Sequence, residues 1–231
     1  MRGAFSLLAV AAFGFIFAGL VFDYSERQLV SELAEYYLTQ VPAQLGAPNV
    51  VTGILISFRG FDTLGEVAVL FMVAASVGAL LTAGAGAGPQ AAGTAATRRP
   101  PSELVRNGAE VVLPLIFLFG AYVIKNGHLS AGGGFQGGAV VASGVMLFML
   151  AYPEGRIPQA FLSVTESLAG VLYVTIGILG IAFAGGFLDS RILPLGEFGT
   201  FISAGAIPLV SALLGIKVGA ELSVIIYRFR S

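Results

Sequence analysis

Several carboxylic acids and one lysine stand inside long apolar stretches of the sequence, where charged side chains are rare. Each such charge costs about 3 kcal/mol in lipid on insertion scales, so it faces protein or water and often marks an ion path. Carboxylate oxygens bind protons and hard cations such as Na⁺ alike. Proton or cation binding is therefore the chemistry offered by Asp62, Glu66, Glu110, Glu166, Lys217 and Glu221.

The segment FRGFDTLGE, residues 58–66, carries the first of these acids. Asp62 and Glu66 are spaced i, i+4, which places them on one face of a helix. Asp62 could cap a helix that starts at the membrane surface beside Arg59. Alternatively, the apolar residues 50–58 extend the helix outward, or lie along the surface, and the extension would put Glu66 well inside the membrane. Glu66 is the first ion-path candidate, with a transient Na⁺ as the one metal expected.

Lys217 and Glu221 are also spaced i, i+4, and Lys217 stands near the middle of its apolar run. They form either a neutralised structural pair or a part of the ion path. Glu110 and Glu166 each lie about two turns inside a predicted helix. Each is either a carboxyl kept protonated or hydrogen-bonded to a neighbouring helix, or a further ion-path residue.

The stretch NGHLSAGGGFQGG, residues 126–138, places the only histidine, His128, before a run of glycines. A phosphate-binding loop would need a preceding strand and a Lys-Ser/Thr pair, and neither is present. Glycines at 132–134 allow a sharp turn, and Gly137 and Gly138 allow a second helix to approach closely. The segment is therefore a tight helical hairpin or re-entrant corner, in which Gly133 and Phe135 serve packing or line an ion path.

Composition indicates the solvent in which these residues work. The chain has 231 residues, 56% hydrophobic and 11% charged, with a mean hydropathy of +0.89, whereas about a quarter of a soluble protein is charged. It contains no cysteine, one histidine and a net charge of −1. Disulfides, thiol chemistry, Cys-ligated metals and a His-rich metal site are excluded, and the charge argues against nucleic acid as a partner. Lipid is the expected surrounding.

Apolar runs long enough to cross a bilayer predict an all-α, polytopic membrane protein. An even number of spans puts both termini on one side, and the arginines on that side, including Arg98, Arg99 and Arg106, predict the cytoplasm. The first run could instead be a signal peptide, but its length and the lack of a small-x-small site favour a span. The six predicted spans are Gly3–Phe22, Phe61–Leu81, Leu104–Ile124, Gly133–Tyr152, Pro158–Gly185 and Phe198–Tyr227.

A Gly/Ala-rich stretch with basic residues and a double proline separates the second span from the third. Such composition neither packs nor continues a helix, which is typical of a flexible linker. We therefore predict a two-span segment at 1–81, a cytoplasmic linker at 82–102 and a four-span domain at 103–231.

Two motifs resemble known families. NGHLSAGGGFQGGAVVASG, residues 126–144, resembles the MrpB/MnhB subunit of multisubunit Mrp-type sodium/proton antiporters and its counterpart in membrane-bound hydrogenases. RGFDTLGEVAVLF, residues 59–71, resembles the hydrogenase-type E subunit, which is also found fused to the C-terminal part of the large Mrp A subunit. The first likeness covers roughly residues 103–231 and the second roughly residues 1–81.

This resemblance implies an all-helical cell-membrane subunit without redox cofactors. Its implied partners are antiporter-like large subunits and a small three-span subunit, and in hydrogenase-like or sulfur-reducing relatives a peripheral hydrogenase-like arm drives the ion traffic. It also implies a place for Glu66 on the ion path and associates Phe135 and a membrane lysine with function. Lys217 is our candidate for that lysine because of its depth.

We therefore expect a non-enzymatic accessory subunit, with no cofactor on this chain, that contributes carboxylates to a sodium or proton path. One alternative is a non-conducting scaffold in the same module of a hydrogenase-like or sulfur-reducing pump. The other is a stand-alone transporter, which would carry ions without partners.

Overall fold

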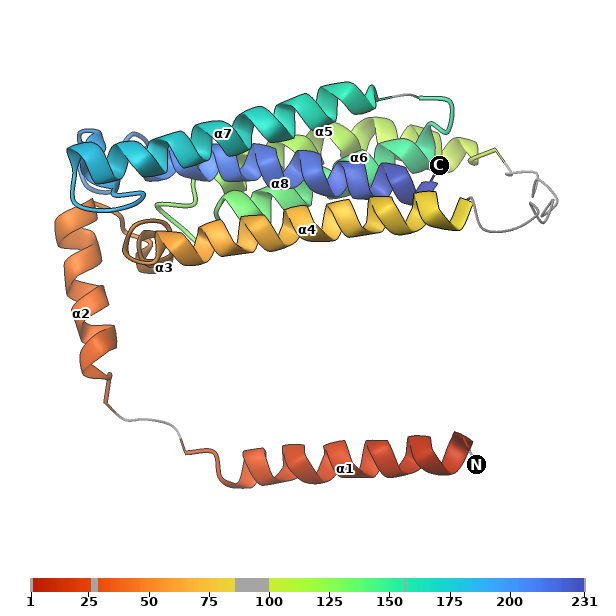
Figure 1. The fold of residues 1–231 in the computed structure, drawn as a ribbon, viewed down its shortest axis with the longest axis horizontal. Helices are drawn as coiled ribbons and strands as arrows, with labels where there is room; N and C mark the ends of the chain where they lie inside the picture. The colour runs from red at the N-terminus through yellow and green to blue at the C-terminus, as the bar shows by residue number, and fades with distance from the viewer. Residues whose placement is uncertain (1, 26–28, 86–99, 156, 231) are drawn as a thin grey trace. The chain divides into compact units, whose positions relative to one another are not determined.

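All six expected spans form long helices in the computed structural model, which describes residues 2–25, 29–85, 100–155 and 157–230 (Figure 1). The described residues contain no strand apart from one isolated bridge between Gly196 and Ser203. The all-α, polytopic fold is therefore confirmed. The cytoplasmic placement of the termini stays a prediction, and most of the expected linker, residues 86–99, lies outside the described residues.

The chain divides into two units, Met1–Tyr36 and Tyr37–Ser231. In the first unit, helix α1 (Arg2–Phe22) is apolar on every side, and its side chains from residue 3 onward are exposed. Such a helix suits lipid or another membrane helix rather than water. Helix α2 (Glu32–Gln40) begins in this unit and ends in the second.

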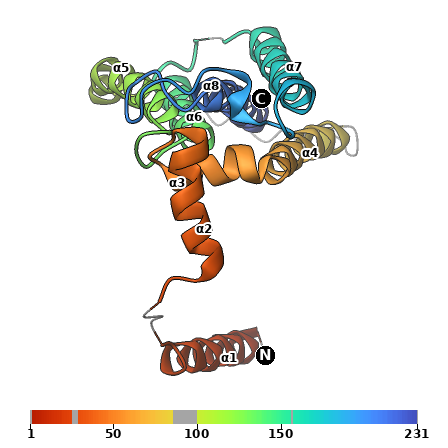
Figure 2. The same ribbon diagram turned by 90° about the vertical axis from the view of Figure 1, so that its left-hand side faces the viewer.

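In the second unit, five long helices form a bundle around α8 (Ile207–Arg230), which contacts each of the other four (Figure 2). It is the most buried of the candidate spans among the described residues. The bundle therefore has a central helix whose polar side chains are removed from lipid. Its neighbours are α4 (Gly60–Ala85), α5 (Glu103–Lys125), α6 (Gly134–Ala151) and α7 (Gln159–Phe183).

Residues 50–58 do not extend α4, so the expected outward extension of that helix is wrong, whereas the expected position of the segment at the membrane surface stays a prediction. They form a short helix, α3 (Val50–Gly53), and a π-helical turn, η2 (Ile54–Phe58), after the π-helical turn η1 (Val41–Leu45). The helical path breaks at Arg59, whose backbone angles of −123° and 36° are not helical. Thr52, Gly53 and Ile56 are buried in the bundle, since the chain folds back onto it.

The sixth span is shorter than expected, because residues 198–206 are not helical. Positive φ angles at Gly199, Ala204 and Gly205 turn the backbone sharply in this stretch, and a right-handed helix does not tolerate them. A short 3₁₀ turn, η3 (Ser190–Ile192), precedes it. Residues 184–206 thus form a structured loop that closes one end of the bundle.

Close packing of helices depends on the glycines of α6, as the sequence predicted. A Cβ atom at Gly138 would lie 2.8 Å from the carbonyl oxygen of Gly215 on α8. A Cβ atom at Gly137 would lie 2.8 Å from the carbonyl oxygen of Gly120 on α5. Side chains at these positions would force the backbones apart, so α6 requires glycine on two faces.

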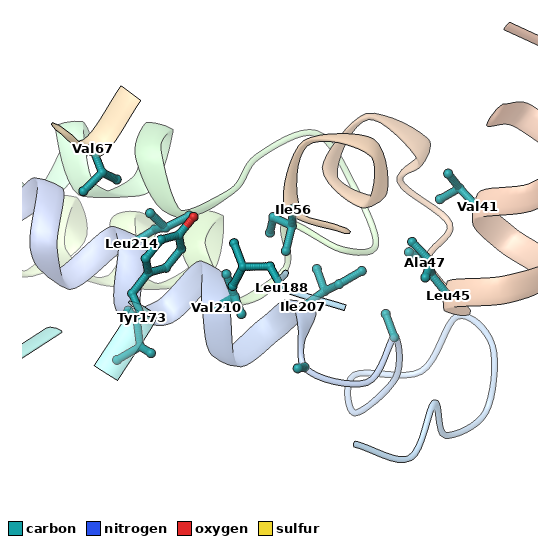
Figure 3. Packing of buried hydrophobic residues seen from close by; sticks show 13 residues of the cluster. Val41, Leu45, Ala47, Ile56, Val67, Tyr173, Leu188, Ile207, Val210 and Leu214 are labelled. Carbon is teal, nitrogen blue, oxygen red and sulfur yellow. The ribbon is translucent and has the colours of Figure 1, made fainter. Parts of the chain in front are cut away.

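A cluster of buried apolar side chains joins the folded-back segment to the bundle (Figure 3). Tyr173 of α7 lies among Val67 of α4 and Val210 and Leu214 of α8 (Figure 3). Ile56 of η2 packs into the same cluster. The segment before the linker and the domain after it therefore share one core.

Candidate functional site

Glu66 and the glycine-rich segment line the same cleft, although the linker separates them in sequence. The cleft has a volume of about 390 Å³. Thr63 and Glu66 line it from α4, Thr52 from α3, and residues 132–136 from the start of α6. The first turn of a helix presents unpaired N–H groups and the positive end of its dipole, so this cleft sets a carboxylate beside partial positive charge.

Two side chains of α3 and its cap hold the glycine-rich segment in place. The side-chain amide of Asn49 donates hydrogen bonds to the carbonyl oxygens of Gly127 at 2.8 Å and Ser130 at 2.7 Å. The hydroxyl of Thr52 also donates to Gly127 O, at 2.8 Å. Asn49 also caps α3, since its side chain accepts from the N–H of Thr52 at 3.3 Å. Asn49 therefore both caps α3 and holds the glycine-rich segment in place.

Backbone shape completes the corner. Gly132 and Gly133 have φ angles of +155° and +145°, which residues other than glycine rarely adopt. The N–H of Gly133 donates to the carbonyl oxygen of Val123 at 3.1 Å, which ties the corner to the end of α5. Phe135 follows in the first turn of α6 and is 38% exposed at the cleft. The sharp turn expected from the glycines is confirmed.

The loop of residues 184–206 covers the other side of the corner. Lys125 Nζ donates to the carbonyl oxygen of Phe201 at 2.8 Å and lies 3.9 Å from the centre of its ring. His128 is buried, with Nε2 at 3.4 Å from the carbonyl oxygen of Thr200. Desolvation lowers the pKa of His128 from its ordinary value, and the nearby charge of Lys125 acts in the same direction. A buried neutral imidazole in this position braces the loop.

Within α4 the two acids differ in their surroundings. Asp62 forms an ion pair with Arg59, and both side chains are about half exposed, at 46% and 59%. Asp62 does not line the cleft with Glu66. The Glu66 side chain is exposed on the outside of the bundle as well as lining the cleft, so in a membrane it requires a polar neighbour there.

A second cluster of charges lies in the interior of the bundle. Lys217 Nζ of α8 lies 3.0 Å from Glu221 Oε2 and 3.4 Å from Glu166 Oε1 of α7. The i, i+4 pair expected from the sequence is present, and Glu166 joins it. Side-chain exposure is 8% for Lys217, 13% for Glu166 and 0% for Glu221. We call these three residues the acid–lysine cluster.

Glu110 belongs to neither group. It lies on an exposed face of α5, where it accepts a hydrogen bond from the hydroxyl of Tyr152 at 3.3 Å. Arg106, one turn earlier, lies 5.8 Å from the centre of the Tyr152 ring. The structure thus places Glu110 in a polar group at the end of the bundle opposite the glycine corner, because α5 starts there.

Sequence reasoning missed Asn49, Thr52 and Tyr173. An Asn-x-x-Thr pattern before an apolar run could have indicated the helix cap, but nothing local indicates the bonds to the loop. Tyr173 stands in an apolar span without a charged neighbour in sequence. In the part of the chain that the structure describes, no three His, Cys, Asp or Glu residues gather as they would around a metal ion.

Comparison with known proteins matches both halves of the chain to family models. Residues 104–224 match a domain related to the MnhB subunit of Na⁺/H⁺ antiporters. Residues 1–90 match the MbhE family, the E-type subunits of MBH. The two matches meet near the expected linker.

Among individual relatives, a chain of the membrane-bound sulfane sulfur reductase, an archaeal respiratory membrane complex, is 35% identical with a TM-score of 0.80. The match covers 99% of this chain and 97% of that one. A probable K⁺/H⁺ antiporter A/B subunit of Rhizobium meliloti is 30% identical over 90% of this chain but only 22% of its own length. A chain of the Mrp complex from Dietzia sp. shares the fold at 23% identity, with a TM-score of 0.76 over 99% of this chain and 26% of its own.

Proposed function

Because the chain belongs to the family of domains related to the MnhB subunit of Na⁺/H⁺ antiporters, we propose that it is an accessory subunit of a multisubunit ion-translocating membrane complex. Its contribution is a stretch of a sodium or proton path in which Glu66 is the principal ion-binding carboxylate.

The observation that carries the proposal is the shared cleft of Glu66 and the glycine corner. The residues from the two family matches meet there, and Asn49 and Thr52 keep them together. A carboxylate, a threonine hydroxyl and the N–H groups of a helix start supply both acceptors and donors for a partly hydrated ion. The exposed side of Glu66 is completed by a neighbouring protein of the complex.

The same proposal includes the setting of the chain. It works in the cell membrane, carries no cofactor and catalyses no reaction of its own. Its partners are the other membrane subunits of the complex, among them antiporter-like large subunits and a small three-span subunit. Any redox step takes place on a peripheral arm of the complex, and this chain belongs only to the membrane module.

A second observation bears on the kind of complex. The match to the archaeal respiratory complex extends over nearly the whole of both chains, whereas the antiporter relatives reported above are about four times longer than the matched part. The chain of the respiratory complex is also the more similar in sequence, at 35% identity against 23% for the chain of the Mrp complex. This similarity favours a redox-driven pump as the parent complex. In such a pump, the alternative to an ion path is a scaffold role for this chain.

The test replaces Glu66 in the whole complex. Glu66→Gln keeps the shape of the side chain but removes its charge, so we expect an assembled complex with strongly reduced sodium-dependent proton movement in vesicles. Glu66→Asp, one methylene shorter, is expected to be milder. Asp62→Asn is the matched control, because it removes a carboxylate one turn away that lies outside the cleft. Wild-type flux in an assembled Glu66→Gln complex would exclude Glu66 as the principal ion-binding carboxylate and favour the scaffold role.

A further inference from the structure

The acid–lysine cluster contains one more acid than base. Lys217 lies between Glu166 and Glu221, and no second base forms an ion pair with either carboxylate among the described residues. With all three groups ionised, the cluster would hold a net charge of −1 in the interior of a membrane bundle. An uncompensated buried charge is costly enough that such a group usually becomes neutral.

One atom of the cluster identifies where the charge is least tolerable. Glu221 Oε1 is buried and has no hydrogen-bond partner in the described part of the chain, whereas Oε2 is paired with Lys217. Leaving a carboxylate oxygen unpaired in an apolar interior costs far more than leaving an oxygen of a neutral carboxyl unpaired. The geometry therefore calls for a positive ligand at this carboxyl.

A cleft connects the cluster with its surroundings. Glu166 and Lys217 line a cleft of about 490 Å³ between α4 and α7, together with Phe71 and Tyr173. The stem of Lys217 crosses α7 at Gly170, where a Cβ atom would lie 3.6 Å from its Cδ. Glycine at this position leaves the cleft room beside the lysine, so an ion can reach the cluster without unfolding a helix.

We propose that the acid–lysine cluster binds one proton, shared between Glu166 and Glu221, and exchanges it through the cleft between α4 and α7. The proton adds to a carboxylate oxygen and leaves to water or a neighbouring acceptor, and Lys217 remains an ammonium throughout. This site adds a proton-binding residue pair to the proposed ion path. It rests on the proposed function only in that the bound proton takes part in ion translocation.

Tyr173 lines the same cleft as Glu166 and Lys217 and extends this site along α7. Its hydroxyl is buried and lacks a hydrogen-bond partner within the described residues. On α7 it lies about 10 Å from Glu166 along the helix axis, at about 1.5 Å per residue. The titratable groups that face the route are thus Glu66 from α4, Glu166 and Tyr173 from α7, and Lys217 and Glu221 from α8.

The experiment counts protonated carboxyls by infrared difference spectroscopy of the purified, assembled complex at neutral pH. Glu221→Gln or Glu166→Gln leaves one acid with one base, so each difference spectrum should show the loss of one protonated carboxyl band. Lys217→Met leaves two acids without a base, so its spectrum should show the gain of one such band. Glu110→Gln, at the opposite end of the bundle from Glu66 and outside the cluster, is the control for effects of any acid-to-amide change.

The opposing outcomes are equally definite. Unchanged carboxyl bands in both glutamine variants would overturn the one-proton site, even if Lys217→Met fails to assemble. A band that appears in the wild type only after sodium is removed would also overturn it, since the resident ligand would then be the metal cation. The spectra do not depend on flux, so normal transport in Glu66→Gln would reject the proposed ion path while leaving this site in place.

Discussion

Asn49 and Gly127 are joined by a hydrogen bond of 2.8 Å, although 78 positions separate them in the sequence. Asn49 precedes the helix that folds back before α4, and Gly127 opens the glycine-rich corner between α5 and α6. The bond determines that Glu66 of the first segment and Phe135 of the second line one cleft. The geometry of the proposed ion path therefore depends on the hydrogen bonds that Asn49 and Thr52 donate to this corner.

Replacing Asn49 tests this relationship. Asn49→Ala removes both the cap of α3 and the bonds to the corner, and we expect a loss of about 1–2 kcal/mol of stability with reduced ion flux. Asn49→Ser is the matched control, because serine caps a helix as well as asparagine but is too short to reach Gly127. Thermal unfolding and flux of the two variants separate the cap from the clamp. Equal flux in the Asn49→Ser and wild-type complexes would show that the clamp does not matter for transport.

Gly137→Ala should disrupt the packing of α6 on α5. The added Cβ would lie 2.8 Å from the carbonyl oxygen of Gly120, and neither backbone can move without separating the helices. We expect destabilisation of about 1–3 kcal/mol, typical of overpacking, seen as a lower unfolding temperature and less assembled complex. Gly108→Ala on α5 serves as control, since nothing within 4 Å would meet its Cβ. A Gly137→Ala complex as stable as this control would contradict the close approach.

Tyr173→Phe distinguishes a proton route from simple packing. The hydroxyl has no hydrogen-bond partner among the described residues, so its removal should leave unfolding temperature unchanged or slightly raised. If protons pass between the acid–lysine cluster and Glu66, flux should nevertheless fall several-fold. Tyr24→Phe, at a residue that is 76% exposed and lines neither cleft, should leave flux unaltered. Stability and flux that are both unchanged in Tyr173→Phe would exclude the hydroxyl from the route.

The lowered pKa of His128 leads us to expect that the stability of the fold depends on pH. Burial lowers its pKa from the ordinary value of 6.5, so the unfolded chain takes up a proton more readily than the folded one. The stabilising contribution is therefore complete above pH 6.5 and decreases as pH falls from 6.5 towards the lower pKa of the folded state. Unfolding temperature should drop over that window, and His128→Gln should remove the drop.

Asp189 provides the internal comparison for this measurement. Its hydrogen bonds with Arg191 lower the pKa of the Asp189 carboxyl below 3.8, so its contribution is present above that pH and is lost only in stronger acid. The loss from His128 begins below pH 6.5, whereas the loss from Asp189 begins only below pH 3.8. An identical drop near pH 6 in His128→Gln and wild type would assign it to another group.

Much of this protein could be read from the sequence because its main signals are local. Lengths of apolar runs determined the number and type of the six long helices, since a bilayer leaves few other structures that satisfy the backbone. The i, i+4 spacing determined that Lys217 pairs with Glu221, and the glycines at 132, 133, 137 and 138 indicated the corner and the close packing. Each of these depends on residues within a few turns of one another.

Tertiary structure decided what no local pattern contains. Glu166 joins Lys217 across 51 positions because α7 packs against α8 in one rotational setting, and a different setting would point it at lipid. Residues 50–58 fold back rather than extend α4, because burying their apolar side chains in the bundle favours a break at Arg59. Contacts between distant segments are set by the packing of whole helix faces, and a single sequence does not state which faces meet.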